Sequence, residues 1–204
     1  MNEPAVYAGR LDSPRFITVV SGLPRSGTSM VMQMLAAGGI PLLTDGVRAP
    51  DRDNPRGYFE FEPVKRTRED PSWVPAALGK AVKVVTVLLR DLPPEFDYRV
   101  ILTCRDLDEI VASQKAMLDR LRRTGPKASD AKLKELFQEE LERVSRWLTT
   151  QPNFRVLTVV HGDCIRDPLL TAESINGFLD GKRDIPQMAE VVDHTLYRKI
   201  AVRI

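Results

Sequence analysis

A glycine loop between a strand and a helix constrains the fold of this chain more than any other feature of its sequence. Gly22 and Gly27 have the spacing of the Gly-x-x-x-x-Gly-Lys-Ser/Thr loop that cradles phosphate groups, and Ser29 keeps its hydroxyl. Residues 16–20 before the loop are apolar, as in a buried parallel strand. Apolar residues after it recur at helical spacing: Met30, Val31, Met34 and Leu35. Because backbone N–H groups at a helix N-terminus bind anions, the loop predicts a phosphate site.

The lysine of the nucleotide-hydrolysing form of this loop is absent. Thr28 occupies its position, and a cation stands inside the loop instead, at Arg25. That lysine normally reaches the β- and γ-phosphates of a nucleoside triphosphate. The loop therefore indicates phosphate binding strongly and ATP hydrolysis weakly. The alternative is an ordinary strand-to-helix turn, which the two glycines and their flanking elements disfavour.

Short apolar runs alternate with helical patterns along the rest of the chain, which predicts a parallel sheet flanked by helices. We expect an α/β, three-layer P-loop-type fold in a single domain spanning residues 1–204. The further strands are predicted at residues 81–87, 98–104 and 154–160. One further helix is predicted at about residues 108–122, a second begins near residue 129, and a third ends at about residue 179. Residues 44–63 are predicted to be a long irregular connection, and the tail from Ile185 a short helix or an extended stretch.

The predicted helix from residue 129 is amphipathic, and its charged side chains are expected to form a solvated face. Six apolar residues are expected to face inward: Leu133, Leu136, Phe137, Leu141, Val144 and Leu148.

Composition limits the classes of function. A net charge of +2 over 204 residues is too low for the dense basic surface of most nucleic-acid-binding proteins. No apolar run is long enough to span a membrane, and the first fifteen residues lack a signal-peptide pattern, so we expect a cytoplasmic protein without a membrane partner. Cys104 and Cys164 lack metal-site spacing, so we expect free thiols and no metal.

A second arginine follows the predicted strand at residues 98–104. Arg105 lies at the carboxyl end of that strand, where open α/β sheets bind ligands, and Ser113 comes eight residues later in the next helix. A guanidinium and a hydroxyl in these positions suit a second phosphate. The alternative is a surface ion pair between Arg105 and Asp106.

Three motifs together resemble the sulfotransferase superfamily. Residues 23–29, Leu-Pro-Arg-Ser-Gly-Thr-Ser, resemble its 5′-phosphosulfate loop, Pro-Lys/Arg-Ser-Gly-Thr-Thr/Ser. Residues 105–113 are similar to its 3′-phosphate motif, an arginine followed eight residues later by a serine. Residues 163–168, Asp-Cys-Ile-Arg-Asp-Pro, resemble its Tyr-Glu-Asp-Leu-x-x-Asp-Pro segment. The resemblance covers about residues 16–180, in the order of the family.

This resemblance implies a donor, 3′-phosphoadenosine 5′-phosphosulfate (PAPS), and sulfuryl transfer to a hydroxyl or amine, with 3′,5′-ADP as product and no metal. Arg25 would neutralise the charge that develops on the leaving phosphate. Arg105 and Ser113 would hold the 3′-phosphate, and His161 aligns with the tyrosine of the third motif, near the adenine. The 5′-phosphate loop would comprise Pro24, Arg25, Ser26, Gly27, Thr28 and Ser29.

The catalytic base differs from the usual one of the family. Lys83 matches a lysine of the cytosolic members, but Val85 stands where their histidine would be. Membrane-bound members use a glutamate, and Glu60 and Glu62 are the candidates here, with Glu60 favoured. Burial could raise one of their pKa values. The alternative is that both carboxylates lie in solvent or pair with Arg56 and Lys65.

Other departures concern the adenine and the acceptor. Met30 replaces a tryptophan that many members stack on the adenine, and the Arg-Lys-Gly-x-x-Gly segment near the family's C-terminus is missing, with residues 197–199 as a substitute. The acceptor is expected to be a small molecule or a glycan. A group of basic residues hints that it is anionic, or marks only a soluble surface: Arg48, Arg52, Arg56, Lys65, Arg66 and Arg68.

Two rival functions stay open. A nucleotide-binding sensor or docking protein without transferase activity would explain the missing histidine and the missing C-terminal segment. An ATP-dependent phosphotransferase is disfavoured by Thr28 at the lysine position.

Overall fold

The computed structural model describes residues 16–51, 54, 56–120 and 128–193. Four parallel strands form its central sheet, in the order β2-β1-β3-β4. They are β1 (Phe16–Gly22), β2 (Ala81–Lys83), β3 (Asp97–Cys104) and β4 (Phe154–Val160). Because the strands are parallel, their carboxyl ends share one edge of the sheet. The predicted α/β class is confirmed.

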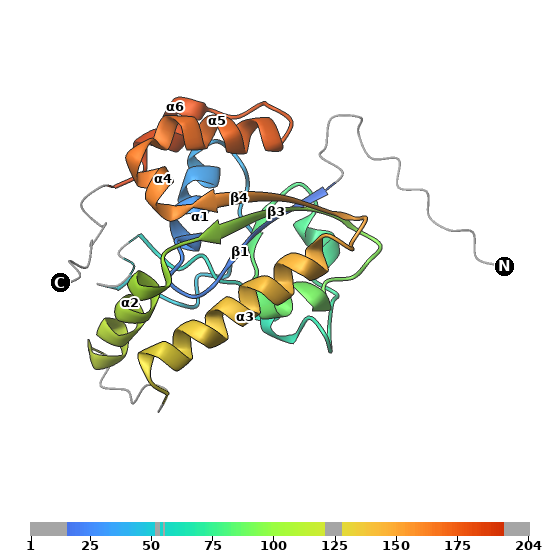
Figure 1. The fold of residues 1–204 in the computed structure, drawn as a ribbon. Helices are drawn as coiled ribbons and strands as arrows, with labels where there is room; N and C mark the ends of the chain where they lie inside the picture. Colours follow the sequence, from blue (N-terminus) through green and yellow to red (C-terminus); the bar gives the residue numbers. More distant parts are fainter. Residues whose placement is uncertain (1–15, 52–53, 55, 121–127, 194–204) are drawn as a thin grey trace.

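Helices cover both faces of the sheet and make three layers (Figure 1). One layer contains α1 (Thr28–Ala37), α4 (His161–Arg166), α5 (Pro168–Phe178) and α6 (Ile185–Glu190). The other contains α2 (Leu107–Arg120), α3 (Asp130–Leu148) and three 3-10 turns, η1 (Glu62–Arg66), η2 (Val74–Ala77) and η3 (Thr86–Asp91). Alternate residues of β1 supply the two cores, because Val20 packs under α1 and Val19 packs toward α3.

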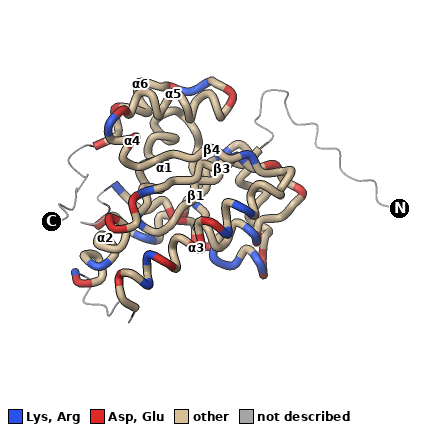
Figure 2. Tube along the Cα trace, in the orientation of Figure 1, with Lys and Arg blue, Asp and Glu red and all other residues tan. Residues whose placement is uncertain are grey.

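Local sequence signals explain where several helices begin. Ser129 accepts a hydrogen bond from the backbone N–H of Lys132 and so caps α3. Asp167 and Asp184 cap α5 and α6 in the same way, each followed by a proline in the first turn. Acidic and basic residues are interspersed along α3 (Figure 2), and most of its charged residues are exposed. The solvated face that the sequence predicted is therefore present.

The predicted strand at residues 81–87 is wrong beyond Lys83. The backbone N–H of Val84 still bonds to the carbonyl oxygen of Val20, but the chain then turns into η3. Val85 and Val87 are exposed, so the apolar run contains two residues that do not belong to the core. Apolarity alone did not reveal this, since buried and exposed valines look the same in a sequence.

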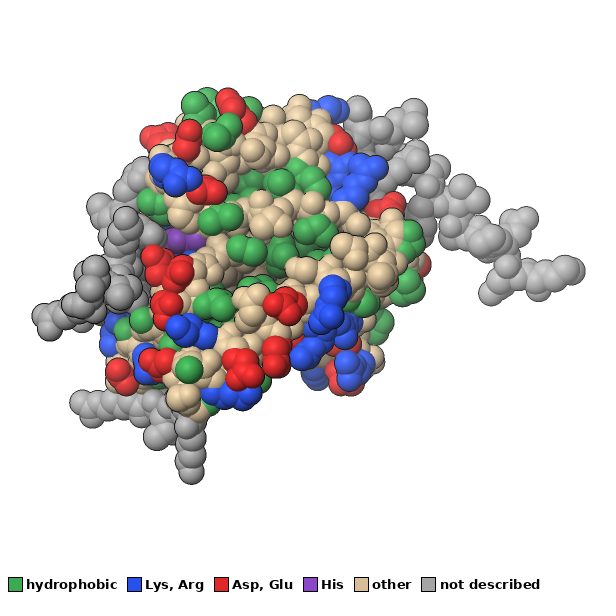
Figure 3. Space-filling model, in the orientation of Figure 1, with side chains coloured by type: hydrophobic (Ala, Val, Ile, Leu, Met, Phe, Trp, Pro, Cys, Tyr) green, Lys and Arg blue, Asp and Glu red, His purple; other side chains and the backbone are tan. Residues whose placement is uncertain are grey.

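The predicted strand at residues 154–160 is confirmed as β4, but the predicted inward face of α3 needs correction. Leu136 of α3 is exposed, and only Val144 and Leu148 of the predicted inward face are fully buried, because the first half of α3 extends past the sheet (Figure 1). In β4, Val156 and Val160 are exposed, and hydrophobic side chains are visible along this part of the surface (Figure 3). The tail from Ile185 starts as the short helix α6, and residues 194–204 lie outside the described part.

Both cysteines are free thiols, and Cys164 is buried in the core. In the part of the chain that the structure describes, no helix combines the length and the apolar character needed to cross a bilayer.

Candidate functional site

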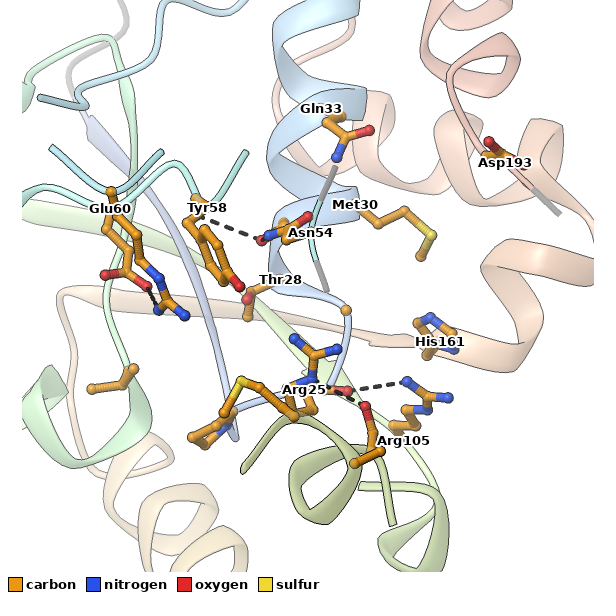
Figure 4. Close-up of a pocket in the computed structure, with 18 of the residues that line it drawn as sticks. Arg25, Thr28, Met30, Gln33, Asn54, Tyr58, Glu60, Arg105, His161 and Asp193 are labelled. Carbon is orange, nitrogen blue, oxygen red and sulfur yellow. Dashed lines mark hydrogen bonds and ion pairs between the residues drawn. The ribbon is translucent and has the colours of Figure 1, made fainter. Parts of the chain in front are cut away.

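A cavity of about 450 Å³ opens at the carboxyl edge of the sheet. The loop after β1, the first turns of α1, the connection before η1, the helix α2 and the start of α4 all contribute to its wall (Figure 4). This volume lies in the range of small-molecule sites, and the position is the one where open α/β sheets bind ligands.

The two glycines of the loop are required by close contacts. A Cβ on Gly22 would lie 2.2 Å from the side-chain oxygen of Thr103, and one on Gly27 would lie 2.6 Å from Cδ2 of His161. Gly27 also has a φ of 104°, in the region that favours glycine. The loop thus runs tightly between β3 and α4, and its backbone borders the cavity.

Ser26 secures the loop from behind. Its hydroxyl is buried and lies 2.7 Å from the carbonyl oxygen of Leu23, to which it donates, and 2.6 Å from the Thr103 hydroxyl. Its backbone N–H also donates to Leu23, at 3.1 Å. Unlike the rest of the predicted loop, Ser26 does not line the cavity. Both of its polar groups hold the loop closed rather than facing a ligand.

Arg25 has an unusual backbone and a half-buried side chain. Its φ of 73° lies in the left-handed region, which is uncommon for a residue with a side chain. Its Nε donates to the hydroxyl of Ser113 at 3.0 Å. Burial, partly offset by the nearby Tyr58 and reinforced by Arg105, lowers the pKa of Arg25. The first and second predicted motifs are therefore in direct contact.

Arg105 lies beside the loop at the end of β3. Its Nε pairs with Oε2 of Glu109 at 2.8 Å, and another guanidinium nitrogen donates to the carbonyl oxygen of Arg25 at 3.2 Å (Figure 4). Asp106, its expected partner in the alternative interpretation, instead accepts from the backbone N–H of Glu109. Arg105 thus lines the cavity, held in place by one carboxylate and the loop backbone.

His161 is the first residue of α4 and lies against Gly27. Burial and, to a lesser extent, the positive charge of Arg105 lower its pKa to about 4. The imidazole is therefore neutral at neutral pH, and it borders the cavity next to the loop.

Lys83 approaches the site from the end of β2, behind the first turn of α1. Its Nζ donates to the hydroxyl of Ser29 at 2.9 Å and to the carbonyl oxygen of Tyr58 at 2.6 Å. Burial lowers the pKa of Lys83 to about 8, even though Glu60 opposes the shift. Lys83 does not itself line the cavity, so it reaches a ligand through Ser29.

The two candidate carboxylates occupy different places. Glu60 lines the cavity and pairs with Arg48 at 2.8 Å. The guanidinium of Arg48 in turn lies 3.3 Å from the centre of the Tyr58 ring. Glu62 begins η1, pairs with Lys65 and is not part of the cavity wall. Of the two, only Glu60 is placed to meet a bound molecule.

The basic residues that hinted at an anionic acceptor do not gather in the cavity. Arg48 lines it, but Arg56 bonds to Asp193 and to the carbonyl oxygen of Val191. Lys65, Arg66 and Arg68 are exposed and do not belong to the cavity wall. Arg52 and residues 197–199 lie outside the described residues. These basic residues therefore fit the alternative that they mark only a soluble surface, better than they fit an anionic acceptor.

Several residues of the cavity wall carried no motif signal. Asn54, Met117, Arg120 and Asp193 contribute to it and were not singled out by the sequence. Tyr58 could have been found, since an aromatic residue beside Glu60 in a glycine-rich connection is a recognisable pattern. Among the described residues, no group of three or more His, Cys, Asp or Glu side chains is placed to hold a metal ion.

No protein-family model matches the sequence. No curated protein matches it significantly. Solved structures do match it. The sulfotransferase domain of the Synechococcus PCC 7002 olefin synthase is 18% identical, with a TM-score of 0.53, over 89% of this chain and 78% of that one. The sulfotransferase domain from the curacin biosynthetic pathway is 14% identical, with a TM-score of 0.53, over 88% and 78%.

A third match is retinol dehydratase, whose structure contains androsterone and the inactive cofactor PAP. It is 16% identical, with a TM-score of 0.50, over 88% of this chain and 64% of that one. At these identities the three likenesses establish a common fold.

Proposed function

We propose that this chain, which has a sulfotransferase-like fold, moves a sulfuryl group from PAPS to a hydroxyl or amine of a small-molecule or glycan acceptor. One observation carries the proposal: Arg25, Arg105 and Ser113 come from two separate motifs and line the same cavity, and Arg25 is hydrogen-bonded to both of the others. We further propose that the protein works in the cytoplasm, where free thiols are stable.

The residues of the cavity fit such a donor. The start of α1 offers backbone N–H groups and the positive end of its dipole to a 5′-phosphate, and Gly27 lets the loop lie close to it. Arg105 would take the 3′-phosphate, which ATP and ADP lack. His161, being neutral and buried, and Met30 would form the part of the wall that meets the adenine.

The chemistry is an in-line displacement at sulfur. The acceptor oxygen or nitrogen forms a bond to sulfur while the bond from sulfur to the 5′-phosphate oxygen breaks, and its electron pair stays on that phosphate. Arg25 supplies positive charge to this leaving oxygen. Glu60 takes the proton of the acceptor, and Arg48 fixes the direction of its carboxylate. The products are the sulfated acceptor and 3′,5′-ADP, and no step calls for a metal.

The proposal is tested by incubating the protein with PAPS and a panel of alcohols, phenols, amines and glycans. Mass spectrometry then measures the sulfated product and 3′,5′-ADP together. We expect equal amounts of the two with at least one acceptor class. Binding of 3′,5′-ADP without any product would favour the rival interpretation, a nucleotide-binding sensor or docking protein.

A further inference from the structure

The hydroxyl of Ser29 has two donors aimed at its oxygen. Nδ2 of Asn54 lies 2.7 Å from it, and Nζ of Lys83 lies 2.9 Å from it. The two donors come from different elements, Asn54 from the connection before η1 and Lys83 from the end of β2. Ser29 itself lies in the first turn of α1, on the wall of the cavity.

A hydroxyl accepts two hydrogen bonds and donates one. With both lone pairs of Ser29 occupied, its proton must point elsewhere. The carbonyl oxygen of Tyr58 lies 3.5 Å from the Ser29 hydroxyl oxygen, which exceeds the ordinary length of a hydroxyl hydrogen bond. Lys83 already donates to that same oxygen at 2.6 Å. Within the part of the chain that the structure describes, the proton of Ser29 therefore has no acceptor at an ordinary hydrogen-bond length, and it is available to a ligand.

Asn54 is held firmly enough to impose this direction. Its backbone N–H donates to a carboxylate oxygen of Asp51 at 3.0 Å, and its carbonyl oxygen accepts from the backbone N–H of Gly57 at 3.0 Å. The hydroxyl of Tyr58 also donates to Asp51, at 2.8 and 2.9 Å from its two oxygens. The backbone of Asn54 is thus hydrogen-bonded through both its N–H and its carbonyl oxygen, and its side chain points at α1 (Figure 4).

We propose that Asn54 and Lys83 are positioning residues that turn the Ser29 proton toward the 5′-phosphate of the donor. This inference rests on the proposed function for the identity of the ligand, but its chemistry requires only a phosphate at the start of α1. Because both lone pairs of its oxygen are occupied, the Ser29 hydroxyl can then only donate a hydrogen bond to the phosphate. Asn54 acts only through Ser29, so its contribution disappears when the hydroxyl is removed.

The decisive variant is Asn54→Asp, which keeps the shape of the side chain but replaces a donor with an acceptor. The carboxylate would take the Ser29 proton away from the phosphate. Gln33→Glu is the matched control, because Gln33 also lines the cavity and the change adds the same charge with the same shape. Asn54→Ala, which adds no charge, is the second variant. Thermal unfolding of each variant confirms that it folds.

Dissociation constants are measured for 3′,5′-ADP, for ADP and for inorganic pyrophosphate, in the wild-type and in the Ser29→Ala background. We expect Asn54→Asp to weaken 3′,5′-ADP binding about tenfold more than Gln33→Glu does, and Asn54→Ala to weaken it about fivefold. In the Ser29→Ala background, Asn54→Ala should have no further effect, and Asn54→Asp should match Gln33→Glu.

Equal effects of Asn54→Asp and Gln33→Glu would overturn the inference, as would an Asn54→Ala effect that survives without the Ser29 hydroxyl. Different outcomes would contradict the proposed function. If wild-type protein binds ADP and pyrophosphate as well as 3′,5′-ADP, the donor assignment is wrong, while the Ser29 comparison still holds with pyrophosphate. If wild-type protein binds none of the three, both are wrong.

Discussion

At the scale of single residues, Arg25 is the centre of the site. A left-handed backbone costs free energy for a residue with a side chain and persists only where its surroundings impose it. Here the carbonyl oxygen of Arg25 is held by Arg105 and its Nε is held by Ser113. The loop thus presents a cation whose position is fixed before any ligand binds, which is the arrangement that electrostatic catalysis requires.

Replacing Arg25 with alanine should lower turnover by about 10²–10³-fold, the range for losing one donor to transition-state charge. Steady-state kinetics with saturating PAPS measures the loss. Arg25→Lys is the control, since it keeps the charge, and it should retain more activity than the alanine variant. Near-normal turnover in Arg25→Ala would remove Arg25 from the mechanism.

Arg105→Ala should act mainly on the 3′-phosphate, with a smaller effect on both nucleotides because Arg105 also donates to the carbonyl oxygen of Arg25 in the loop. We expect the affinity for 3′,5′-ADP to fall about 10- to 100-fold, as for a lost charge-assisted hydrogen bond, while the affinity for ADP changes little. Arg68→Ala is the control, because Arg68 is exposed and pairs with Asp91 away from the cavity. Equal losses for ADP and 3′,5′-ADP would contradict the assigned role.

The two glutamates provide a matched pair. Glu60→Gln should lower turnover by about 10²-fold if Glu60 takes the acceptor proton, whereas Glu62→Gln should leave turnover within about twofold. Turnover is compared at saturating donor and acceptor. If both variants keep full turnover, neither carboxylate is the base.

At the scale of elements, the strand-loop-helix unit depends on the close contact between the loop and α4. Gly27→Ala should prevent nucleotide binding and destabilise the fold, because the new Cβ would lie 2.6 Å from His161 at an unfavourable φ. Gly39→Ala measures the cost of the positive φ without a steric clash, because Gly39 has a φ of 84° and a new Cβ there would have nothing within 4 Å.

Gly39→Ala should therefore cost about 1–3 kcal/mol of unfolding free energy and leave 3′,5′-ADP binding intact. Denaturant unfolding and calorimetry measure both quantities. A Gly27→Ala protein that binds like Gly39→Ala would show that the loop does not need its contact with His161.

The sequence predicted the elements best where periodicity and end signals agreed. The unit from residue 16 to Gly38 has a buried strand, a glycine turn and a helical apolar pattern, and the structure has all three. The prediction failed where apolar residues were not buried, as at Val85, Val87 and Leu136. The exposure of the two valines depends on where β2 ends, and that of Leu136 depends on how far the first half of α3 extends past the sheet. A local sequence pattern contains neither.

The candidate site was predictable from the sequence where its residues belong to motifs with fixed spacing. Arg25, Arg105, Ser113 and His161 come from motifs with fixed spacing, and the parallel topology brings them to one edge. Asn54 and Arg48 come from the irregular connection, whose path follows no periodicity, so only the structure could place them. The sequence favoured Glu60 over Glu62, and the structure supplies the geometric reason: Glu60 lies on the cavity wall, whereas Glu62, two positions later, begins η1.

At the scale of the whole molecule, the buried His161 should make stability depend on pH. Its pKa in the folded protein is about 4, below the ordinary value of 6.5, so the unfolded chain binds more protons between these values. The unfolding free energy should therefore be unaffected by His161 above about pH 6.5 and should fall as the pH is lowered toward 4.

Denaturant titrations between pH 4 and 7.5 measure this dependence. His161→Gln removes the titrating group, so the variant should lose less stability than the wild type over the same window. Parallel curves for the two proteins would mean that His161 does not resist protonation in the fold.

We expect the cavity to recognise a nucleotide by its 3′- and 5′-phosphates. Calorimetric titration of the wild-type protein with 3′,5′-ADP, ADP and ATP, each with and without Mg²⁺, measures this selectivity. We expect tight binding of 3′,5′-ADP that does not depend on Mg²⁺, and weak binding of the other two. A preference for ATP with Mg²⁺ would contradict this expectation and would identify the loop as part of a nucleoside triphosphate site.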